Sequence, residues 1–200
     1  MNTFNFSSNI SLENKVVLLR PLEISDYETL LPFSLQEPEI WKYSLVAAGS
    51  AEMLKQYIQT AVEARIQKNE YPFIVFDKRK NQYAGSTRFY DIQLYHKTLQ
   101  LGYTWYGKEF QGSGINKHCK FLMLQFAFEE MKFERVEFRA DLNNQRSIQA
   151  MKSIGCKPEG ILRSNTVTHS GKRRDTIVLS ILADEWFKEV RDYLSGKLIW

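Results

Sequence analysis

Hydrophobic and polar residues alternate along several short stretches of the chain, which is the pattern of a β-strand. In LQLGYTW, residues 99–105, the apolar positions are Leu99, Leu101, Tyr103 and Trp105. We expect these four side chains to share one face of a strand. Strands are also expected over 16–21, 71–77, 82–92 and 135–141, and a hairpin of two further strands is expected around the turn HSGK at 169–172.

Apolar residues at helical spacing predict helices over 25–35, 50–69, 116–131, 143–155 and 183–194. The third of these contains FLMLQFAF, which is apolar nearly all round, so we expect it to be buried against a sheet. His118 and Cys119 are neighbours in this helix. Because consecutive helical residues point in different directions, we expect one of the two to be buried and the other to be exposed.

The order of these elements indicates the fold class. One strand is followed by two helices, three strands, a helix, a strand, a helix and two strands, which is typical of a mixed α/β sheet. We see no internal repeat, low-complexity tract or linker-like change in composition. The simplest interpretation is one domain over residues 1–200.

Composition and charge narrow the function classes. The chain is 44% hydrophobic and 25% charged, which is the balance of an ordinary globular protein, and its net charge of +4 is too small to indicate nucleic-acid binding. Cys119 and Cys156 have no CxxC spacing, which argues against a disulfide framework or a zinc site. The N-terminal segment lacks the features of a signal peptide, and no apolar run approaches the roughly 20 residues of a membrane helix. We expect a cytoplasmic protein without a membrane partner.

The loop YGKEFQGSGIN, residues 106–116, carries candidate chemistry between a strand and a helix. Gly112 and Gly114 allow positive φ and close approach of a ligand to the main chain. Free N–H groups at the start of a helix favour a phosphate, and nearby positive charge is expected from Lys108, Lys117 and Lys120. The alternative is a tight turn with Asn116 as helix cap. Neither GxxxxGK[ST] nor GxGxxG is present.

Two motifs resemble a known family. The segment Gln111-Gly-Ser-Gly114-Ile-Asn116 resembles the coenzyme A loop [QR]-x-x-G-x-[GA] of the GNAT N-acetyltransferases. The segment Asn144-Gln-Arg-Ser147-Ile148, followed by SIGCKPEG, resembles the branch that acetylates ribosomal-protein N-termini, the Rim-type enzymes. Asn116 and Cys156 depart from the usual residues. The resemblance covers roughly residues 16–190 and implies a mostly antiparallel, six- to seven-stranded mixed sheet, splayed at its centre and flanked by helices on both faces.

The resemblance implies direct transfer of an acetyl group from acetyl-CoA to an amine, without a metal. The coenzyme would be bound by the loop residues Gln111, Gly112, Ser113, Gly114, Ile115 and Asn116, by Asn144 through the pantetheine arm, and by main-chain N–H groups of Tyr103, Thr104 and Trp105 at a bulge in their strand. Gly102 fits such a local distortion. The chain has no GxSxG serine elbow that would favour an acyl-enzyme.

The resemblance also suggests roles in proton transfer and acceptor binding. Ser147 would donate a proton to the leaving thiolate, although it could simply lie in the first turn of a helix capped by Asn144. Glu137 and Asp91 are candidates for the base, and each could be a plain ion-pair or edge residue. The acceptor wall would be formed by Trp41, Tyr43, Arg88 and Tyr90, which could equally be ordinary core residues.

The acceptor itself stays open at this stage. A protein N-terminus and a small amine are both compatible with the resemblance, and the protein would act as a monomer or homodimer. A CoA-binding module that senses or scaffolds without turnover is the alternative. An RNA-binding domain would need clustered basic and aromatic residues on one sheet face, and the sequence offers no such cluster.

Overall fold

One mixed sheet organises the molecule in the computed structural model, which describes residues 4–199. Its strands are β1 (Leu12–Glu13), β2 (Val17–Pro21), β3 (Tyr71–Asp77), β4 (Gln82–Gln93), β5 (Thr98–Tyr106), β6 (Arg135–Asp141), β7 (Lys157–Val167) and β8 (Arg173–Leu182). They are arranged in the order β1-β2-β3-β4-β5-β6-β8-β7, and β5 pairs with β6 in parallel while the other neighbouring strands are antiparallel. The predicted mixed sheet is confirmed. It has eight strands and not six to seven, because the two-residue β1 is too short to show an alternating pattern in the sequence.

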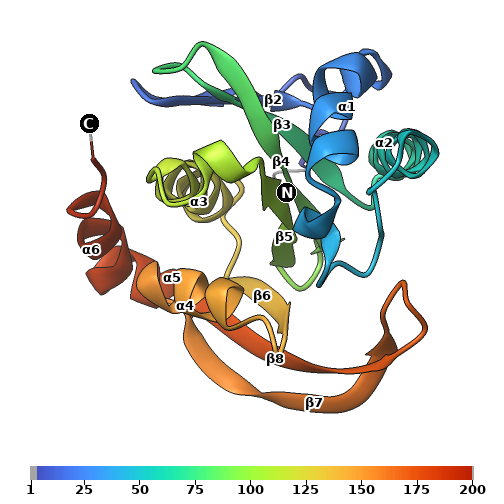
Figure 1. The fold of residues 1–200 in the computed structure, drawn as a ribbon. Helices are drawn as coiled ribbons and strands as arrows, with labels where there is room; N and C mark the ends of the chain where they lie inside the picture. Colours follow the sequence, from blue (N-terminus) through green and yellow to red (C-terminus); the bar gives the residue numbers. More distant parts are fainter. Residues whose placement is uncertain (1–3, 200) are drawn as a thin grey trace.

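Helices cover both faces of the sheet, as predicted. They are α1 (Tyr27–Gln36), α2 (Ala51–Ile66), α3 (Ile115–Gln125), α4 (Gln145–Ser153), α5 (Ala183–Glu185) and α6 (Arg191–Ser195). A π-helical turn, Phe126–Glu130, extends α3, and another, Trp186–Val190, joins α5 to α6. In Figure 1, α1 and α2 lie on one side of β2–β5 and α3 lies on the other.

Two hydrophobic clusters stabilise these layers. The larger one joins α3, α4 and the C-terminal helical segment to the sheet, and the smaller one joins α1 and α2 to the opposite face. Ser50 caps the start of helix α2, since its hydroxyl accepts from the Met53 N–H at 3.3 Å. The helix buries Leu54, Tyr57 and Ile58. Within residues 4–199 no helix is long and apolar enough to cross a membrane.

The interior of α3 differs from expectation. His118 and Cys119 are both fully buried, so the prediction that one of them would be exposed is wrong. The reason is that α3 is covered on two sides. Cys119 packs into the larger cluster, while the His118 ring bonds Asn14 Nδ2 at 3.1 Å and the Ile199 carbonyl at 2.9 Å.

A bulge in β5 changes which residues face each core. Ser86 pairs with Trp105 and Arg88 pairs with Gly102, so Tyr103 and Thr104 lie opposite Thr87 alone. Leu99 and Leu101 therefore face the α3 side, while Trp105 and Tyr103 pack on the α1 and α2 side. The prediction that these four side chains share one face is wrong, because the extra residue reverses the alternation.

The sheet divides between β5 and β6. These strands pair only where Thr98, Leu99 and Gln100 meet Arg135, Val136 and Glu137. Beyond Gln100 the strands separate, and β6, β8 and β7 curve away from β2–β5 (Figure 1). The expected splay at the centre of the sheet is confirmed.

Candidate active site

The glycine loop leaves open space at both of its glycines. Gly112 has φ of 78° and Gly114 has φ of 88°, the left-handed region that side chains rarely adopt. A Cβ built at either position would meet no atom within 4 Å. The left-handed backbone, and not contact with the rest of the protein, therefore accounts for glycine at both positions, and the space beside them is open to a ligand.

Several N–H groups of this loop are available to a ligand. Gly114 is the N-cap of α3 and gives no side-chain cap. Among the described residues, the N–H groups of Gly112, Gly114 and Asn116 have no hydrogen-bond acceptor. Unpaired N–H groups at the positive end of a helix dipole suit a phosphate, so this loop fits the diphosphate of coenzyme A.

Asn116 does not cap the helix. It lies within α3, two residues after the N-cap Gly114. Its Oδ1 accepts a hydrogen bond from the Tyr106 hydroxyl at 3.4 Å. The alternative interpretation of Asn116 as the helix cap is therefore wrong, and its side chain links α3 to the end of β5.

The positive charges near the loop differ from those predicted. Lys108 forms an ion pair with Glu39, and Lys120 is buried in the interior, so Lys120 is not a loop charge. Arg79 instead reaches the loop from the β3–β4 turn and donates to the Ser113 carbonyl at 3.4 Å.

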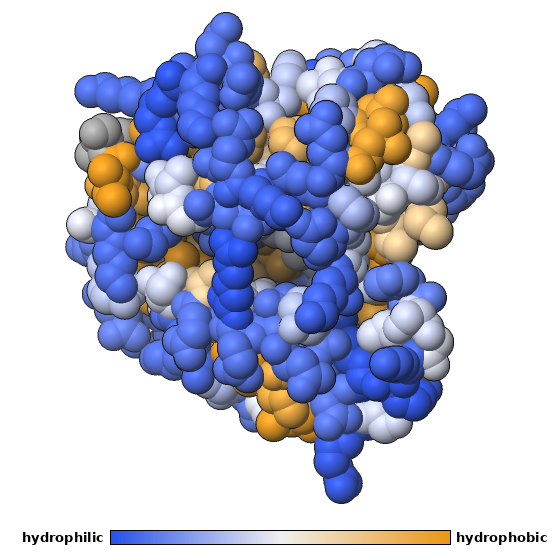
Figure 2. Space-filling model, viewed as in Figure 1, coloured by the Kyte–Doolittle hydropathy of each residue, from blue (hydrophilic) through white to orange (hydrophobic). Residues whose placement is uncertain are grey.

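Gln111 connects the two motifs in space. Its Nε2 donates to the Tyr106 carbonyl at 2.7 Å, and its Oε1 accepts from Arg146 Nη1 at 2.5 Å. Arg146 lies on α4, so the end of β5, the loop and α4 are held together. Sequence spacing gave no sign of Arg146. Figure 2 shows a hollow near the middle of this face, between the parts labelled α3 and α4 in Figure 1, with hydrophilic side chains around it.

Asn144 and Ser147 lie at the start of helix α4. Asn144 is the N-cap, and its Oδ1 accepts from the Ser147 N–H at 3.1 Å, as predicted. The side-chain nitrogen Nδ2 of Asn144 and the hydroxyl of Ser147 have no hydrogen-bond partner within residues 4–199. Ser147 is half-buried, so its hydroxyl is available to a bound molecule.

The β5 bulge lies beside the opening between β5 and β6. Tyr103 has φ of 48°, a left-handed conformation that costs a non-glycine residue roughly 1–3 kcal/mol. The strained residue is thus Tyr103 and not Gly102. Glycine at position 102 has a different reason, which is close packing: a Cβ there would lie 2.9 Å from the Tyr90 ring.

Aromatic rings and one arginine form a continuous cluster on the α1 and α2 side. The Arg88 guanidinium lies 4.2 Å from the centre of the Tyr103 ring and 4.8 Å from that of Tyr57, and it bonds Glu70 at 2.6 Å. Tyr90 packs edge-on against Tyr103 at 5.0 Å, and burial raises the pKa of Tyr90. Arg88 and Tyr90 are therefore brought together next to the bulge.

Trp41 and Tyr43 lie in the segment between α1 and α2. Trp41 is buried and packs on Trp105 at 5.1 Å. The Tyr43 carbonyl accepts from Arg174 at 3.2 Å, and the next carbonyl, of Ser44, contacts His169 at 3.3 Å. The β7–β8 hairpin thus reaches across to the segment between α1 and α2.

The candidate bases are both engaged in hydrogen bonds. Glu137 lies at the last β5–β6 pair, where its oxygens bond Arg135 at 2.8 Å and Arg139 at 2.6 Å. Asp91 bonds Gln93 and Gln100, each at 2.7 Å. Glu137 is the better placed of the two because it is at the apex of the opening.

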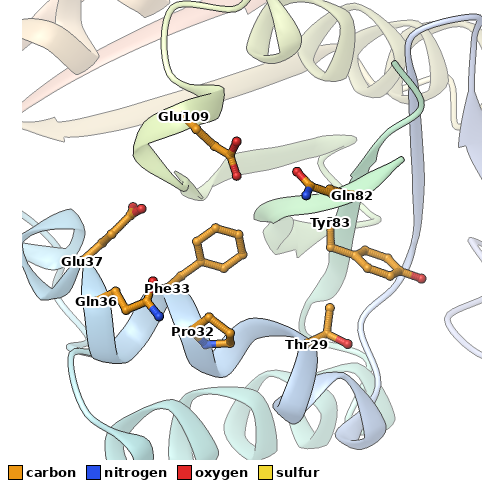
Figure 3. Close-up of a pocket in the computed structure, with 8 residues that line it drawn as sticks. All are labelled: Thr29, Pro32, Phe33, Gln36, Glu37, Gln82, Tyr83 and Glu109. Carbon is orange, nitrogen blue, oxygen red and sulfur yellow. The ribbon is translucent and has the colours of Figure 1, made fainter. Parts of the chain in front are cut away.

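A separate pocket lies on the other side of the loop, between α1, the start of β4 and Glu109 (Figure 3). It has a volume of about 400 Å³, and its charged residues are Glu37 and Glu109. Carboxylates repel phosphate, so this pocket does not fit the coenzyme. Within residues 4–199 no group of His, Cys, Asp and Glu is arranged to hold a metal ion.

Comparisons with known proteins agree with this geometry. The model of the acetyltransferase (GNAT) domain family matches residues 17–157. YjcK of Bacillus subtilis (strain 168), a probable N-acetyltransferase, is 29% identical over 178 residues, which cover 86% of this chain and 96% of YjcK. YdaF of the same organism, a candidate ribosomal N-acetyltransferase, is 25% identical over 177 residues, which cover 86% of this chain and 94% of YdaF.

A solved structure from T. thermophilus, a candidate acetyltransferase, has a TM-score of 0.86 and 30% identity to this chain. It covers 96% of this chain, which in turn covers 99% of that one. The resemblance inferred from the Gln111 and Asn144 motifs is confirmed. The chain belongs to the acetyltransferase (GNAT) family and is an N-acetyltransferase.

Proposed function

We propose that this protein moves an acetyl group from acetyl-CoA to a primary amine by direct attack in a ternary complex. The observation that carries the proposal is that the N–H groups of Gly112, Gly114 and Asn116 have no acceptor within residues 4–199, in a loop with open space where a Cβ of either glycine would be. Those groups would hold the diphosphate. Gln111, Asn144 and main-chain N–H groups of β5 would orient the pantetheine arm and the thioester.

In the proposed reaction the amine nitrogen forms a bond to the thioester carbon and the carbon–sulfur bond breaks. The carbonyl oxygen gains charge and would be stabilised by an N–H group of the β5 bulge. The amine loses a proton, and Ser147 would give one to the departing thiolate. Glu137, at the apex of the opening, is the candidate for accepting the amine proton, directly or through water.

The acceptor would enter from the side of α1 and α2, next to Tyr90, Tyr103 and the segment around Tyr43. A protein N-terminus or a small amine would be acetylated. The name of the relative YdaF supports a ribosomal protein.

Turnover with a panel of acceptors tests the proposal. Thiol release from acetyl-CoA would be followed with ribosomal-protein N-terminal peptides, polyamines and aminoglycosides, and products would be identified by mass spectrometry. We expect one class to be acetylated on its amine. Tight coenzyme binding without transfer to any of these acceptors would contradict the proposed acceptor classes.

A further inference from the structure

A lysine is buried directly behind the β5 bulge. Lys120 lies on α3 and is 5% exposed. Its Nζ donates to Thr104 Oγ1 at 2.7 Å and to Thr87 Oγ1 at 3.2 Å. A lysine is almost never buried to this degree without a partner of opposite charge, so this position calls for an explanation.

Within residues 4–199 no acidic side chain forms an ion pair with Lys120. The titratable groups that act on it are the thiols of Cys119 on α3 and Cys156 at the start of β7. Burial raises the pKa of Cys119 to about 12 and raises that of Cys156 as well, so both thiols are neutral near pH 7. Burial also lowers the pKa of Lys120 from 10.5 to about 7. An apolar side chain would fill this place without that desolvation cost.

The hydroxyl partners of Lys120 connect it to the bulge. Thr87 and Thr104 hydrogen-bond each other at 2.7 Å. Each hydroxyl also lies near the Gly102 carbonyl, at 3.5 Å from Thr87 and 3.4 Å from Thr104. Lys120, the two threonines and the Gly102 carbonyl therefore form one network on the α3 side of β5.

This network sets the direction of one peptide group. The carbonyl of Gly102 and the N–H of Tyr103 belong to the same planar trans peptide, so they point in opposite directions. Because the carbonyl is directed at the threonines, the Tyr103 N–H is directed away from them. Tyr103 has no paired residue in β4. The pairing of β5 with β6 ends at Gln100, so β6 does not pair with Tyr103 either.

We propose that Lys120 is a positioning residue for acetyl transfer, which holds the bulge through Thr104 and Thr87 so that the Tyr103 N–H faces the opening. This inference rests on the proposed function, since that N–H would polarise the thioester carbonyl. It explains why a lysine occupies a place where an apolar residue would be less costly.

Two substitutions remove the network without leaving a large cavity. Lys120→Met keeps the length of the side chain, and Thr104→Val keeps its shape but loses the hydroxyl. Each variant is expected to lower kcat by about tenfold to a hundredfold, less than the roughly hundredfold to thousandfold lost when an oxyanion donor is removed, and to change the KM for acetyl-CoA less than threefold. Thr104→Ser, which restores the hydroxyl, should recover most of kcat. The double variant should be no slower than the slower single variant.

Stability separates this role from a merely structural one. Below pH 7 the wild-type protein holds a buried charge that the Lys120→Met variant lacks. The unfolded lysine keeps its proton up to about pH 10.5, whereas the folded one releases it near pH 7, so the free energy of unfolding of the wild type should rise over that range. We expect Lys120→Met to be at least as stable as the wild type at pH 6, while being slower in catalysis.

Amide hydrogen exchange of the whole chain gives a test that needs no turnover. In Lys120→Met and Thr104→Val, exchange should become faster in peptides that contain residues 102–105, and stay unchanged over α2 and β7. Loss of kcat with faster exchange supports the proposal. Unchanged kcat and unchanged exchange in Thr104→Val, or equal rates in Thr104→Val and Thr104→Ser, would overturn it, even if Lys120→Met failed to fold. A wild-type protein without any transfer would refute the proposed function, and the exchange experiment would still decide the role of Lys120.

Discussion

Several residues in this protein have a backbone conformation or a degree of burial that folding alone does not favour. Tyr103 has positive φ although it carries a large side chain, and Lys120 is buried without a counter-charge. Gly112 and Gly114 are left-handed with empty space where a Cβ would be. All of them lie at the bulge or at the loop, which is where strain and desolvation are expected when they serve a site.

The loop glycines give the first prediction. Gly114→Val should weaken acetyl-CoA binding at least tenfold, because a branched side chain would occupy the space in front of the free N–H groups. Because a left-handed conformation is unfavourable for valine but not for glycine, the substitution should also lower the free energy of unfolding by about 1–2 kcal/mol. Calorimetry and denaturant unfolding measure these two effects.

Gly171→Val is the matched control. Gly171 has φ of 80° and open space around it, but it lies at the tip of the β7–β8 hairpin. This variant should lose similar stability and retain coenzyme affinity. Equal loss of affinity in both variants would mean that Gly114 acts through stability and not through the loop.

Ser147 gives the second prediction. If its free hydroxyl protonates the departing thiolate, Ser147→Ala should lower kcat by about a hundredfold, the scale of general acid catalysis, with little change in coenzyme affinity. Ser153→Ala on the same helix is the control, since the Ser153 hydroxyl donates to the Ala150 carbonyl of its own helix. Steady-state kinetics that show equal kcat for the two variants would reject the acid role of Ser147.

At the scale of elements, the sequence predicted the helices and strands better than their faces. The alternation of LQLGYTW predicts the strand over residues 99–105, whereas the bulge within it was expected only from the family resemblance, because the alternation has no break. The packing of the Tyr103 ring against Arg88 of β4 is a contact that no local pattern contains. The link from Gln111 to Arg146 was missed for the same reason, whereas the Asn144 cap was predicted because capping is local.

The start of α4 gives the third prediction. Asn144→Ala should lower the free energy of unfolding by about 1 kcal/mol, since the cap on Ser147 is lost. Asn144→Asp retains the capping oxygen but lacks the amide N–H groups proposed to contact the pantetheine arm. It should therefore be as stable as the wild type and have a higher KM for acetyl-CoA. An unchanged KM in Asn144→Asp would limit Asn144 to its capping role.

Strand β6 gives the fourth prediction. The ion pairs with Arg135 and Arg139 account for the conformation of Glu137. If Glu137 accepts the amine proton, Glu137→Gln should lower kcat by about a hundredfold, the scale of general base catalysis, and should flatten the acidic limb of the pH–rate profile. A kcat within about threefold of the wild type would reject Glu137 as the base.

At the scale of the whole molecule, two parts of the sheet meet around the proposed site. They are joined by the short β5–β6 pairing, by Gln111 with Arg146, and by the β7–β8 hairpin with the segment around Tyr43. The coenzyme would lie between these parts, and the acceptor would lie on the opposite face. Binding of the coenzyme should therefore stabilise the entire fold.

The hairpin contact gives a prediction about the acceptor. Arg174 is buried and holds the Tyr43 carbonyl, so Arg174→Ala should free the segment that borders the acceptor side. We expect a KM for the acceptor at least fivefold higher, on the order of 1 kcal/mol, with the KM for acetyl-CoA unchanged. Arg173→Ala is the control, because its side chain is exposed and bonds Ser164 within the hairpin.

The most direct test of the account is a calorimetric titration of coenzyme A into the wild-type protein and into Gly114→Val and Gly171→Val. We predict binding at micromolar concentration to the wild type and to Gly171→Val, and a loss of at least tenfold in affinity for Gly114→Val. Absence of heat with the wild type at millimolar coenzyme, or equal affinity in all three proteins, would contradict the assignment of the Gln111–Asn116 loop.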